Sequence, residues 1–415
     1  MLKYWLWLAE LPGLQNQARL ALLRHFGSPE HIFYADEEEL LLAEDVPRKQ
    51  ARLALNRDLS EANRILADCQ RLNLRILTIQ DAEYPDRLRN IYDPPCVLYV
   101  KGRLPAFDEE AAIAVVGVRE CTPYGAACAQ KLGYGLAAGG GLVVTGLAKG
   151  VDAAAAQGAL LAGGRVAGVV GNGLDVRYPY ESRALYDDVP AAGVLLSEYP
   201  PGAPPDKHHF PVRNRILAGL SVAALVVEAP VRSGALITAR LAAEQGRDVF
   251  AVPGPIDAPD SAGCLRLIQD GAGSVTEAWD ILSVYEARFP GKLRRGRSMK
   301  GYRPAPRRQS QPGALPVSET PEGREPAKEP AKKPPEAARQ AEMKRVSAEA
   351  LTDDQIALLG VLEPEEAIQV DDMIQRTGIP ARRVLSALTV LEIDGCVCQH
   401  SGKRYTRTIV LEHSE

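Results

Sequence analysis

Basic residues follow the ends of several predicted strands, and the chemistry that they could perform is phosphate recognition. Arg119 and Lys149 lie at or just after such ends, and Lys207, Arg213 and Arg215 lie in the segment after the fourth predicted strand. Arginine offers a planar fork of donors, whereas lysine offers a point charge. A single loop arginine is usually solvated, but several cations at one sheet edge favour a phosphate-lined groove.

Glycines accompany these cations at the same strand ends. Gly117 precedes Arg119, Gly146 and Gly150 flank Lys149, and Gly234 follows Ser233. Glycine lets backbone amides approach a phosphate closely, and helix N-termini add a favourable partial charge. In an open parallel sheet, ligands bind beyond the carboxyl ends of the strands. We therefore expect this edge to bind an anion.

The common nucleotide, metal and catalytic motifs do not fit the sequence. The first strand exit lacks the G-x-G-x-x-G dinucleotide motif, and no G-x-x-x-x-G-K-[ST] motif occurs. The C-x-x-C pairs that are typical of zinc sites do not occur. The adjacent His208 and His209 point apart in most conformations, so packing is favoured over metal binding. No nucleophile and base stand at a supporting spacing, and we expect neither a cofactor nor catalysis.

A regular alternation of strands and helices must position these residues between positions 106 and 285. The predicted strands are Ile113–Gly117, Leu142–Gly146, Val166–Gly171, Val194–Tyr199, Ala223–Ala229 and Val249–Gly254. The predicted helices include Tyr124–Ala138, Asp152–Ala162 and Ala235–Gln245. Near-continuous apolar strands indicate burial on both faces. The sequence therefore predicts an α/β fold with a Rossmann-like, doubly wound, mostly parallel sheet.

Smaller segments flank this core. Residues 1–70 predict a small helical domain, in which the Leu11–Leu14 turn is similar to helix-hairpin-helix modules, although packing of a helical cap is favoured. Residues 71–285 are assigned to the extended Rossmann-like domain. Residues 286–350 predict a disordered linker, basic at first and then rich in proline, which either attracts DNA or serves as a solvated tether.

Residues 351–415 predict a winged helix. The expected helices are Asp353–Leu362, Val370–Arg376 and Pro380–Glu392, and the expected hairpin strands are Val397–Gln399 and Tyr405–Val410. The third helix opens with Arg382 and Arg383, but the acidic residues around it argue against tight duplex binding. A protein contact, to a partner or a second copy of the chain, is at least as well supported.

Composition agrees with a globular protein of the cytoplasm. The chain has 415 residues, 46% of them hydrophobic, a net charge of -4 and 7 cysteines. An odd number of cysteines without paired spacing favours a reducing compartment. The N-terminus lacks the features of a signal peptide, and no apolar run is long enough for a membrane span. A nucleic-acid site must therefore be a local basic patch.

Ordered motifs across residues 75–285 resemble one protein family. They include Gly117-x-Arg119, Gly146-Leu147-Ala148-x-Gly150-x-Asp152, Gly173-Leu174-Asp175-x-x-Tyr178-Pro179, His209-Phe210-Pro211-x-Arg213-Asn214-Arg215 and Ser233-Gly234-x-Leu236-Ile237-Thr238. Together they strongly resemble the DNA-processing protein A family (DprA, also called Smf). The helical and winged-helix segments are similar to the flanking domains of that family.

The resemblance implies a non-catalytic protein of natural transformation. Such proteins bind and protect incoming single-stranded DNA, help to load the recombinase RecA, and form homodimers through the Rossmann-like domain. With Lys207 added from the strand-exit argument, the expected DNA-binding residues are Gly117, Arg119, Gly146, Lys149, Gly150, Lys207, Arg213, Asn214, Arg215, Ser233, Gly234 and Thr238. Val118 stands where the family usually has serine, which removes one hydroxyl.

An enzymatic alternative remains open at this point. The domain also resembles Rossmann-like nucleotide hydrolases of the lysine-decarboxylase-like group, although their P-G-G-x-G-T-x-x-E motif is replaced here by Val231–Leu236.

Asp152 is interpreted as a helix N-terminal residue, because a free carboxylate there would repel phosphate. Asp175 and Glu228 are expected to order loops, and Ser233 and Thr238 could begin a helix as well as bind a ligand.

Overall fold

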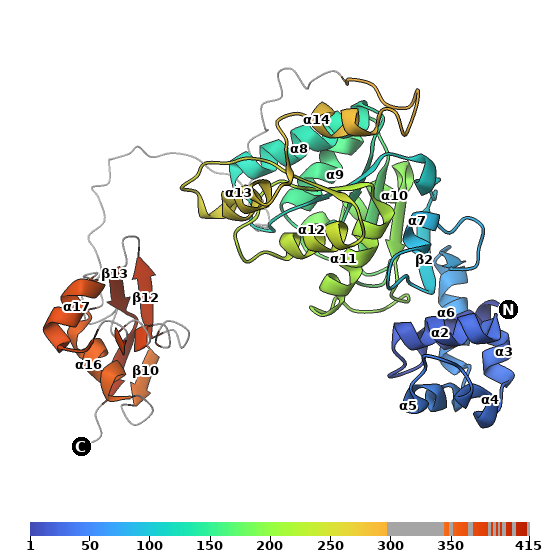
Figure 1. Cartoon of the computed structure of the whole chain (residues 1–415), viewed down its shortest axis with the longest axis horizontal. Helices are drawn as coiled ribbons and strands as arrows, with labels where there is room; N and C mark the ends of the chain where they lie inside the picture. Colours follow the sequence, from blue (N-terminus) through green and yellow to red (C-terminus); the bar gives the residue numbers. More distant parts are fainter. Residues whose placement is uncertain are drawn as a thin grey trace, which may run out of the picture. The chain divides into compact units, whose positions relative to one another are not determined.

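The computed structural model describes residues 1–296 without a gap and, beyond them, 344–347, 352–363, 368–380, 383–384, 387–388, 391, 396–400 and 404–412. The chain divides into two compact units, residues 1–309 and 310–415, which are described separately (Figure 1). None of the described helices combines the length and the hydropathy of a transmembrane span.

A nine-stranded sheet forms the centre of the first unit. Its strands are β1 (Arg75–Thr78), β2 (Val97–Gly102), β3 (Ala112–Val116), β4 (Leu142–Thr145), β5 (Val166–Val170), β6 (Val194–Ser197), β7 (Ala223–Val226), β8 (Asp248–Ala251) and β9 (Gly273–Ser274). They lie in the order β1-β2-β6-β5-β4-β3-β7-β8-β9. Strands β3 to β9 pair in parallel, whereas β2 is antiparallel to both β1 and β6. The predicted mostly parallel Rossmann-like sheet is confirmed.

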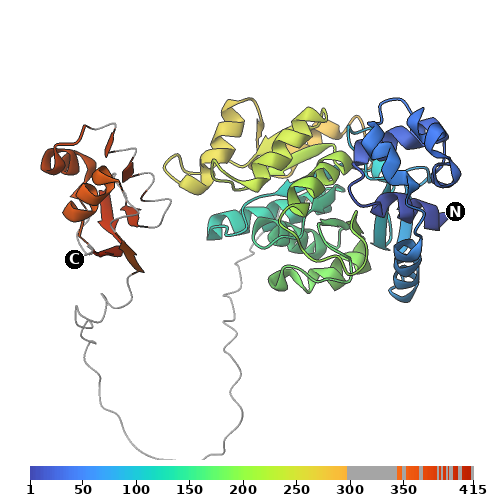
Figure 2. The ribbon, with the colours of Figure 1, turned by 90° about the horizontal axis from the view of Figure 1, so that it is seen from below.

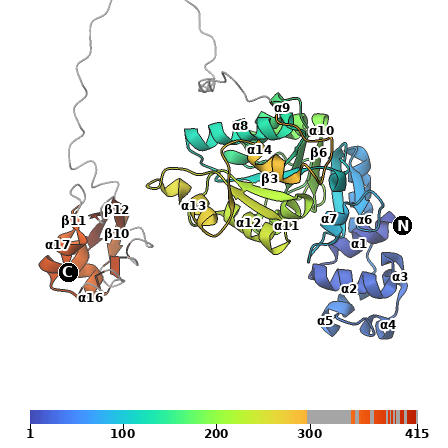
Figure 3. The ribbon, with the colours of Figure 1, turned by 45° about the horizontal axis from the view of Figure 1, so that its top comes forward.

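Helices cover both faces of this sheet (Figure 3). The helices are α7 (Asp86–Arg89), α8 (Pro123–Ala138), α9 (Val151–Leu161), α10 (Leu185–Ala192), α11 (His209–Leu220), α12 (Gly234–Glu244), α13 (Ala262–Gln269) and α14 (Trp279–Leu282). Residues of α8, α9 and α10 share one hydrophobic cluster, and residues of α7, α11 and α12 share the other. Every residue of β3, β4 and β5 is buried, as parallel strands covered on both faces require.

Local sequence fixes where the helices beside the strand ends begin. The Thr122 side chain accepts a hydrogen bond from the Gly125 amide, and Pro123 occupies the first turn of α8. The Ser233 side chain caps α12 by accepting from the Ala235 amide. Each helix therefore starts directly after a strand-exit loop, with its N-terminus beside that loop.

The N-terminal helices pack against the antiparallel edge of the sheet (Figure 2). They are α1 (Leu2–Glu10), α2 (Asn16–Phe26), α3 (Pro29–Tyr34), α4 (Glu37–Leu41), α5 (Arg48–Ala51), the 3₁₀ helix η1 (Arg52–Leu55) and α6 (Ser60–Arg71). Trp5 and Trp7 of α1 belong to the same buried cluster as Tyr99 of β2. The helical segment therefore shares a core with the sheet domain.

The predicted linker begins later than the sequence analysis placed it. Phe289 and Leu293 are buried in the core of the first unit, and the Arg294 amide donates to the Gly139 carbonyl at 3.0 Å. Two apolar residues therefore hold this segment on the domain despite its basic composition. The remainder of the predicted linker lies outside the described residues, except for Lys344–Ser347, which form strand β10.

The second unit has the elements of a winged helix. Helices α16 (Asp353–Val361) and α17 (Val370–Thr377) match the predicted ones within a residue. The strands are β11 (Ile368–Gln369), β12 (Val397–His400), β13 (Arg404–Arg407) and β14 (Ile409–Glu412), and β14 pairs with β10. The predicted third helix, with Arg382, falls largely outside the described residues. The Arg383 guanidinium pairs with Asp354 at 2.8 Å.

Candidate nucleic-acid interface

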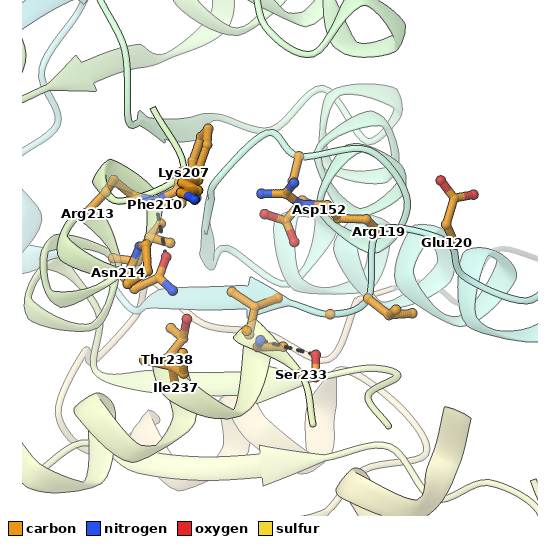
Figure 4. Close-up of a pocket in the computed structure, with 18 of the residues that line it drawn as sticks. Arg119, Glu120, Asp152, Lys207, Phe210, Arg213, Asn214, Ser233, Ile237 and Thr238 are labelled. Atoms are coloured by element: carbon orange, nitrogen blue, oxygen red, sulfur yellow. Dashed lines mark hydrogen bonds between the residues drawn. The ribbon is translucent and has the colours of Figure 1, made fainter. Parts of the chain in front are cut away.

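A cavity of about 580 Å³ opens at the carboxyl end of β3. Strand β3 has β4 on one side and β7 on the other, so the strand order reverses at this point, and such reversals create ligand crevices in open α/β sheets. The walls come from the loop after β3, the start of α11, and the loop after β7 with the start of α12 (Figure 4). We refer to this cavity as the first cavity.

Three exposed cations surround the first cavity: Arg119, Lys207 and Arg232. None of them forms an ion pair within 4.0 Å with a carboxylate of the described residues. They come from three separate strand exits, after β3, β6 and β7. Their charges are consequently available to an anion that enters the cavity.

Aromatic rings line the cavity beside these cations. The Arg119 guanidinium lies over the Phe210 ring, 5.1 Å from its centroid. Phe210 in turn stacks on Tyr178, with centroids 5.8 Å apart and ring planes 28° from parallel. Cations that alternate with aromatic faces suit a ligand that carries both phosphates and planar rings.

Arg213 forms part of the cavity floor. It is 5% exposed, and its guanidinium donates to the carbonyls of Gly146, at 3.0 Å, and Val169, and to the Asn214 side chain at 3.2 Å. A Cβ at Gly146 would come within 2.4 Å of the guanidinium, so only glycine permits this approach. Burial lowers the pKa of Arg213, but an arginine remains charged.

Asp152 also lines the first cavity, in the first turn of α9. Its carboxylate accepts from the Gly146 amide at 3.0 Å, and it is 5% exposed. Burial raises the pKa of Asp152, while the charge of Arg213 and the loop amides oppose that rise. The carboxylate therefore holds the loop after β4 and balances the buried Arg213, consistent with its expected place at a helix N-terminus.

The structure places Arg215 away from the first cavity, contrary to the prediction. Its guanidinium forms a bidentate pair with Glu198, at 2.6 and 2.8 Å, and also contacts Asp93 at 3.0 Å. Burial alone would lower the pKa of Arg215, but the two carboxylates raise it overall. Both carboxylates line a separate cavity of about 310 Å³ between α1, α2 and α11.

Lys149 and Gly150 also lie outside the walls of the first cavity. The Lys149 ammonium pairs with Glu120 at 2.5 Å and lies 3.9 Å from Glu181. Gly150 has a φ of +89°, and a Cβ there would come within 2.3 Å of the Arg119 carbonyl. Gly150 thus sets the shape of the loop that carries Lys149 next to the loop that carries Arg119.

Apart from Gly146, which lines a neighbouring cavity, the other predicted residues meet at the first cavity. Asn214 and Thr238 face it from α11 and α12, as Figure 4 shows. Gly117 and Gly234 line it, together with Ser233, whose hydroxyl is engaged in capping α12. Ser233 therefore is a helix-start residue that also borders the site.

Two carboxylates, the buried Glu228 and the exposed Asp175, order the loops, as expected. Glu228 accepts hydrogen bonds from the Thr122 amide, at 2.7 Å, and from its hydroxyl. Asp175 accepts from the Gly202 amide at 2.8 Å. The Val118 amide donates to the backbone carbonyl of Glu228 at 2.8 Å, so the backbone at position 118, where the family usually has serine, is held by the loop after β7.

Among the cationic and aromatic residues that line the first cavity, sequence reasoning left out three: Arg232, Tyr178 and Phe210. Arg232 follows a strand exit, as the selected cations do, and could have been chosen on that ground. The aromatic residues were quoted only as parts of motifs. Aromatic residues near cations at strand exits are typical of single-strand binding surfaces, and this pattern could have identified Tyr178 and Phe210.

Comparison with known proteins identifies the family. Residues 75–286 match the model of DNA recombination-mediator protein A, and residues 326–403 match that of the DprA winged helix domain. The chain belongs to the DprA family. Protein Smf of Synechocystis sp. is 35% identical over 97% of this chain and 98% of its own length. DNA processing protein DprA of Streptococcus pneumoniae is 47% identical over 50% of this chain and 73% of its own length.

A solved DprA structure agrees with the fold. The X-ray structure of the S. pneumoniae protein covers 68% of this chain and 98% of its own, with a TM-score of 0.60 and 37% identity. The DprA structure from Helicobacter pylori, described for its single-stranded DNA binding mode, covers 52% of this chain at 27% identity and a TM-score of 0.47. DprA proteins are DNA processing proteins, and this chain has both of their characteristic domains.

Proposed function

We propose that this protein binds single-stranded DNA in the first cavity and protects it during natural transformation. The observation that carries the proposal is the set of Arg119, Lys207 and Arg232, which project from three strand exits without a carboxylate partner among the described residues. Phosphate contacts from such cations supply most of the affinity for nucleic acid. They carry no sequence information, which suits DNA of any origin.

The aromatic residues favour a single strand over a duplex. In a duplex the base faces are stacked and unavailable, whereas a single strand can place a base against Phe210 or Tyr178. The first cavity lies beyond the carboxyl end of β3 and is bounded by loops. Its lining can be explained without a long groove that would accept a duplex. Backbone contacts and base stacking together constitute non-specific single-strand recognition.

The broader biological role is proposed from the family. The description of the family as recombination mediators supports delivery of the bound strand to RecA. We propose a homodimer formed through the Rossmann-like domain in the cytoplasm, without a cofactor. We also propose that the protein is non-catalytic, since the lining of the first cavity offers anchoring groups and Asp152, its buried carboxylate, is engaged by a backbone amide.

Binding of labelled oligonucleotides tests this function. The full chain is titrated against a single strand and against the duplex of the same sequence at several salt concentrations, and the single strand should bind more tightly throughout. Incubation with nucleoside monophosphates should release no free base. Equal affinity for both forms of DNA would contradict single-strand recognition, and release of base would favour the nucleotide-hydrolase alternative.

The winged helix has a separate proposed role as a protein-contact domain. A truncated chain that ends at residue 350 retains the first cavity, and its affinity for single strands should equal that of the full chain. Loss of strand binding on truncation would move the principal DNA site to residues 351–415.

A further inference from the structure

A second cavity of about 510 Å³ adjoins the first. It lies beyond the carboxyl ends of β4 and β5, between the loop that carries Lys149 and the loop after β5. The two cavities share walls formed by Arg119, Tyr178, Phe210 and Arg213. A ligand in the first cavity can therefore extend past the stacked Tyr178 and Phe210 rings into the second without leaving the protein surface.

The second cavity repeats the chemistry of the first. Its lining adds Arg177, Lys149 and Tyr180 to the shared cations and rings. Tyr180 is 70% exposed, and the Arg183 guanidinium lies over its ring, 4.3 Å from the centroid. An exposed aromatic ring held by an arginine offers a stacking surface together with a phosphate partner.

Carboxylates moderate the charge of this cavity. Glu120 and Glu181 both face Lys149, and Asp187 pairs with Arg177 at 2.7 Å. The cations here are therefore partly matched, unlike those around the first cavity. Stacking on Tyr180, rather than charge, must supply the larger share of any affinity in the second cavity.

We propose that the second cavity holds a further nucleotide of the same DNA strand, with Tyr180 as the stacking surface for its base. This inference rests on the proposed single-strand function and specifies the path of the strand. The strand runs from the first cavity, across Arg119 and Phe210, to Tyr180 and Arg183. Each cavity falls within the roughly 300–1,000 Å³ range of small-molecule sites, which can accommodate a nucleotide.

The path makes affinity depend on strand length in a particular way. A di- or trinucleotide can occupy the first cavity alone, whereas a strand of about ten nucleotides reaches both cavities. Removing one stacking ring weakens the affinity of single-strand binding proteins by roughly tenfold or more per base. Tyr180→Ala should therefore weaken binding of the long strand about tenfold and leave the short one unchanged.

Fluorescence competition with oligothymidylates of increasing length tests the inference on the full chain. Tyr180→Phe should retain the wild-type length dependence, because the ring remains. Tyr92→Ala removes an 87% exposed tyrosine outside both cavities and serves as the matched control. Circular dichroism and thermal melting of each variant establish that the fold is intact.

The outcomes separate this inference from the function on which it rests. Selective weakening of the long strand by Tyr180→Ala supports the second site. Unchanged binding of the long strand, or equal weakening of both lengths, overturns it, and so does a wild-type affinity that does not rise with length. Failure of the wild-type protein to bind single strands at all, or full binding by Arg119→Ala, contradicts the proposed function itself.

Discussion

Arg119 and Arg215 represent two opposite uses of an arginine in the same domain. Arg119 is exposed at a strand exit, lies over the Phe210 ring and has no ion pair among the described residues. Arg215 is 8% exposed and is bonded to both oxygens of Glu198 and to Asp93. The first is available to bind an anion, whereas the second already binds the anions of its own chain.

The carboxylates around Arg215 also connect it to the N-terminal helices. The Asn16 side chain of α2 donates to the Asp93 carboxylate at 2.7 Å and to the Pro94 carbonyl at 2.8 Å. Because Arg215 lies on α11, which also carries Phe210 and Arg213, this network joins the helical segment to a helix that lines the first cavity. In this domain a buried arginine with carboxylate partners stabilises the fold, whereas an exposed arginine without such partners is available to bind a ligand.

Replacement of Arg215 should have the largest effect, and the effect should be on stability. Arg215→Ala leaves the Glu198 and Asp93 carboxylates partly buried without their partner, and breaking a buried ion pair in this way costs about 3–5 kcal/mol. Urea denaturation measures the loss. Arg119→Ala is the control, and it should change the free energy of unfolding by less than about 0.5 kcal/mol. Equal stability of the two variants would remove the distinction between the arginines.

The titration of Glu10 gives the region around Arg215 a predicted dependence of stability on pH. Burial raises the pKa of Glu10 from 4.5 to about 7, in the cavity that also contains Glu198 and Arg215. A carboxyl whose folded pKa is raised stabilises fully below its unfolded pKa, and this stability is lost as pH rises through the folded pKa. The native state should therefore lose stability between about pH 4.5 and 7 from this group.

The variant Glu10→Gln removes that titration. Its advantage in stability over the wild type should grow with pH and reach about 2 kcal/mol at pH 8, less than the full shift implies because the carboxyl retains some contact with water. Thermal unfolding at intervals from pH 5 to 8 measures the difference. A difference that is constant across this range would show that Glu10 titrates normally.

Loss of the Phe210 ring should weaken DNA binding and should leave the ion pairs of Arg215 intact. Phe210→Ala removes a stacking face and the partner of Arg119, and we expect about a tenfold loss of single-strand affinity. Phe210→Tyr keeps the ring and should bind nearly as the wild type does. Fluorescence anisotropy measures both variants, and normal affinity of Phe210→Ala would exclude the ring from the DNA contact.

The smallest predicted effect concerns Glu120. Glu120 lines both cavities and is paired with Lys149, so Glu120→Gln removes one negative charge that faces the strand. We expect a two- to threefold gain in single-strand affinity at low salt that disappears at high salt, because exposed charges are screened. Glu61→Gln, on the distant helix α6, should leave the affinity unchanged at every salt concentration. A loss of affinity in Glu120→Gln would mean that its pair with Lys149 organises the site.

The parallel strands could be predicted because their burial shows in the sequence. Strands β3, β4 and β5 consist almost entirely of apolar residues, and the predicted ranges contain β4 and β5 and lie one residue later than β3. Strand β2 was not predicted, because the Asp93–Pro95 sequence before it and the Lys101–Gly102 pair at its end are typical of turns. The pairing of β2 with β6 is antiparallel and distant in sequence, and no local signal encodes it.

The different positions of Arg213 and Arg215 show why the sequence alone could not assign both residues correctly. Both stand in one basic run, and sequence alone grouped them. In the helix α11, residues two apart are rotated by about 200°, so one faces the cavity when the other faces away. The carboxylates that engage Arg215 come from positions 93 and 198, and only the folded chain brings them together.

The salt dependence of single-strand binding tests most directly that unpaired strand-exit cations hold the DNA. The logarithm of the binding constant is measured against the logarithm of salt concentration for the wild type, Arg119→Ala and Arg52→Ala, whose exposed arginine pairs with Glu37. Each lost phosphate contact should reduce the slope by about 0.7 for a single strand. Arg119→Ala should show this reduction and Arg52→Ala the wild-type slope. An unchanged slope in Arg119→Ala would contradict the account.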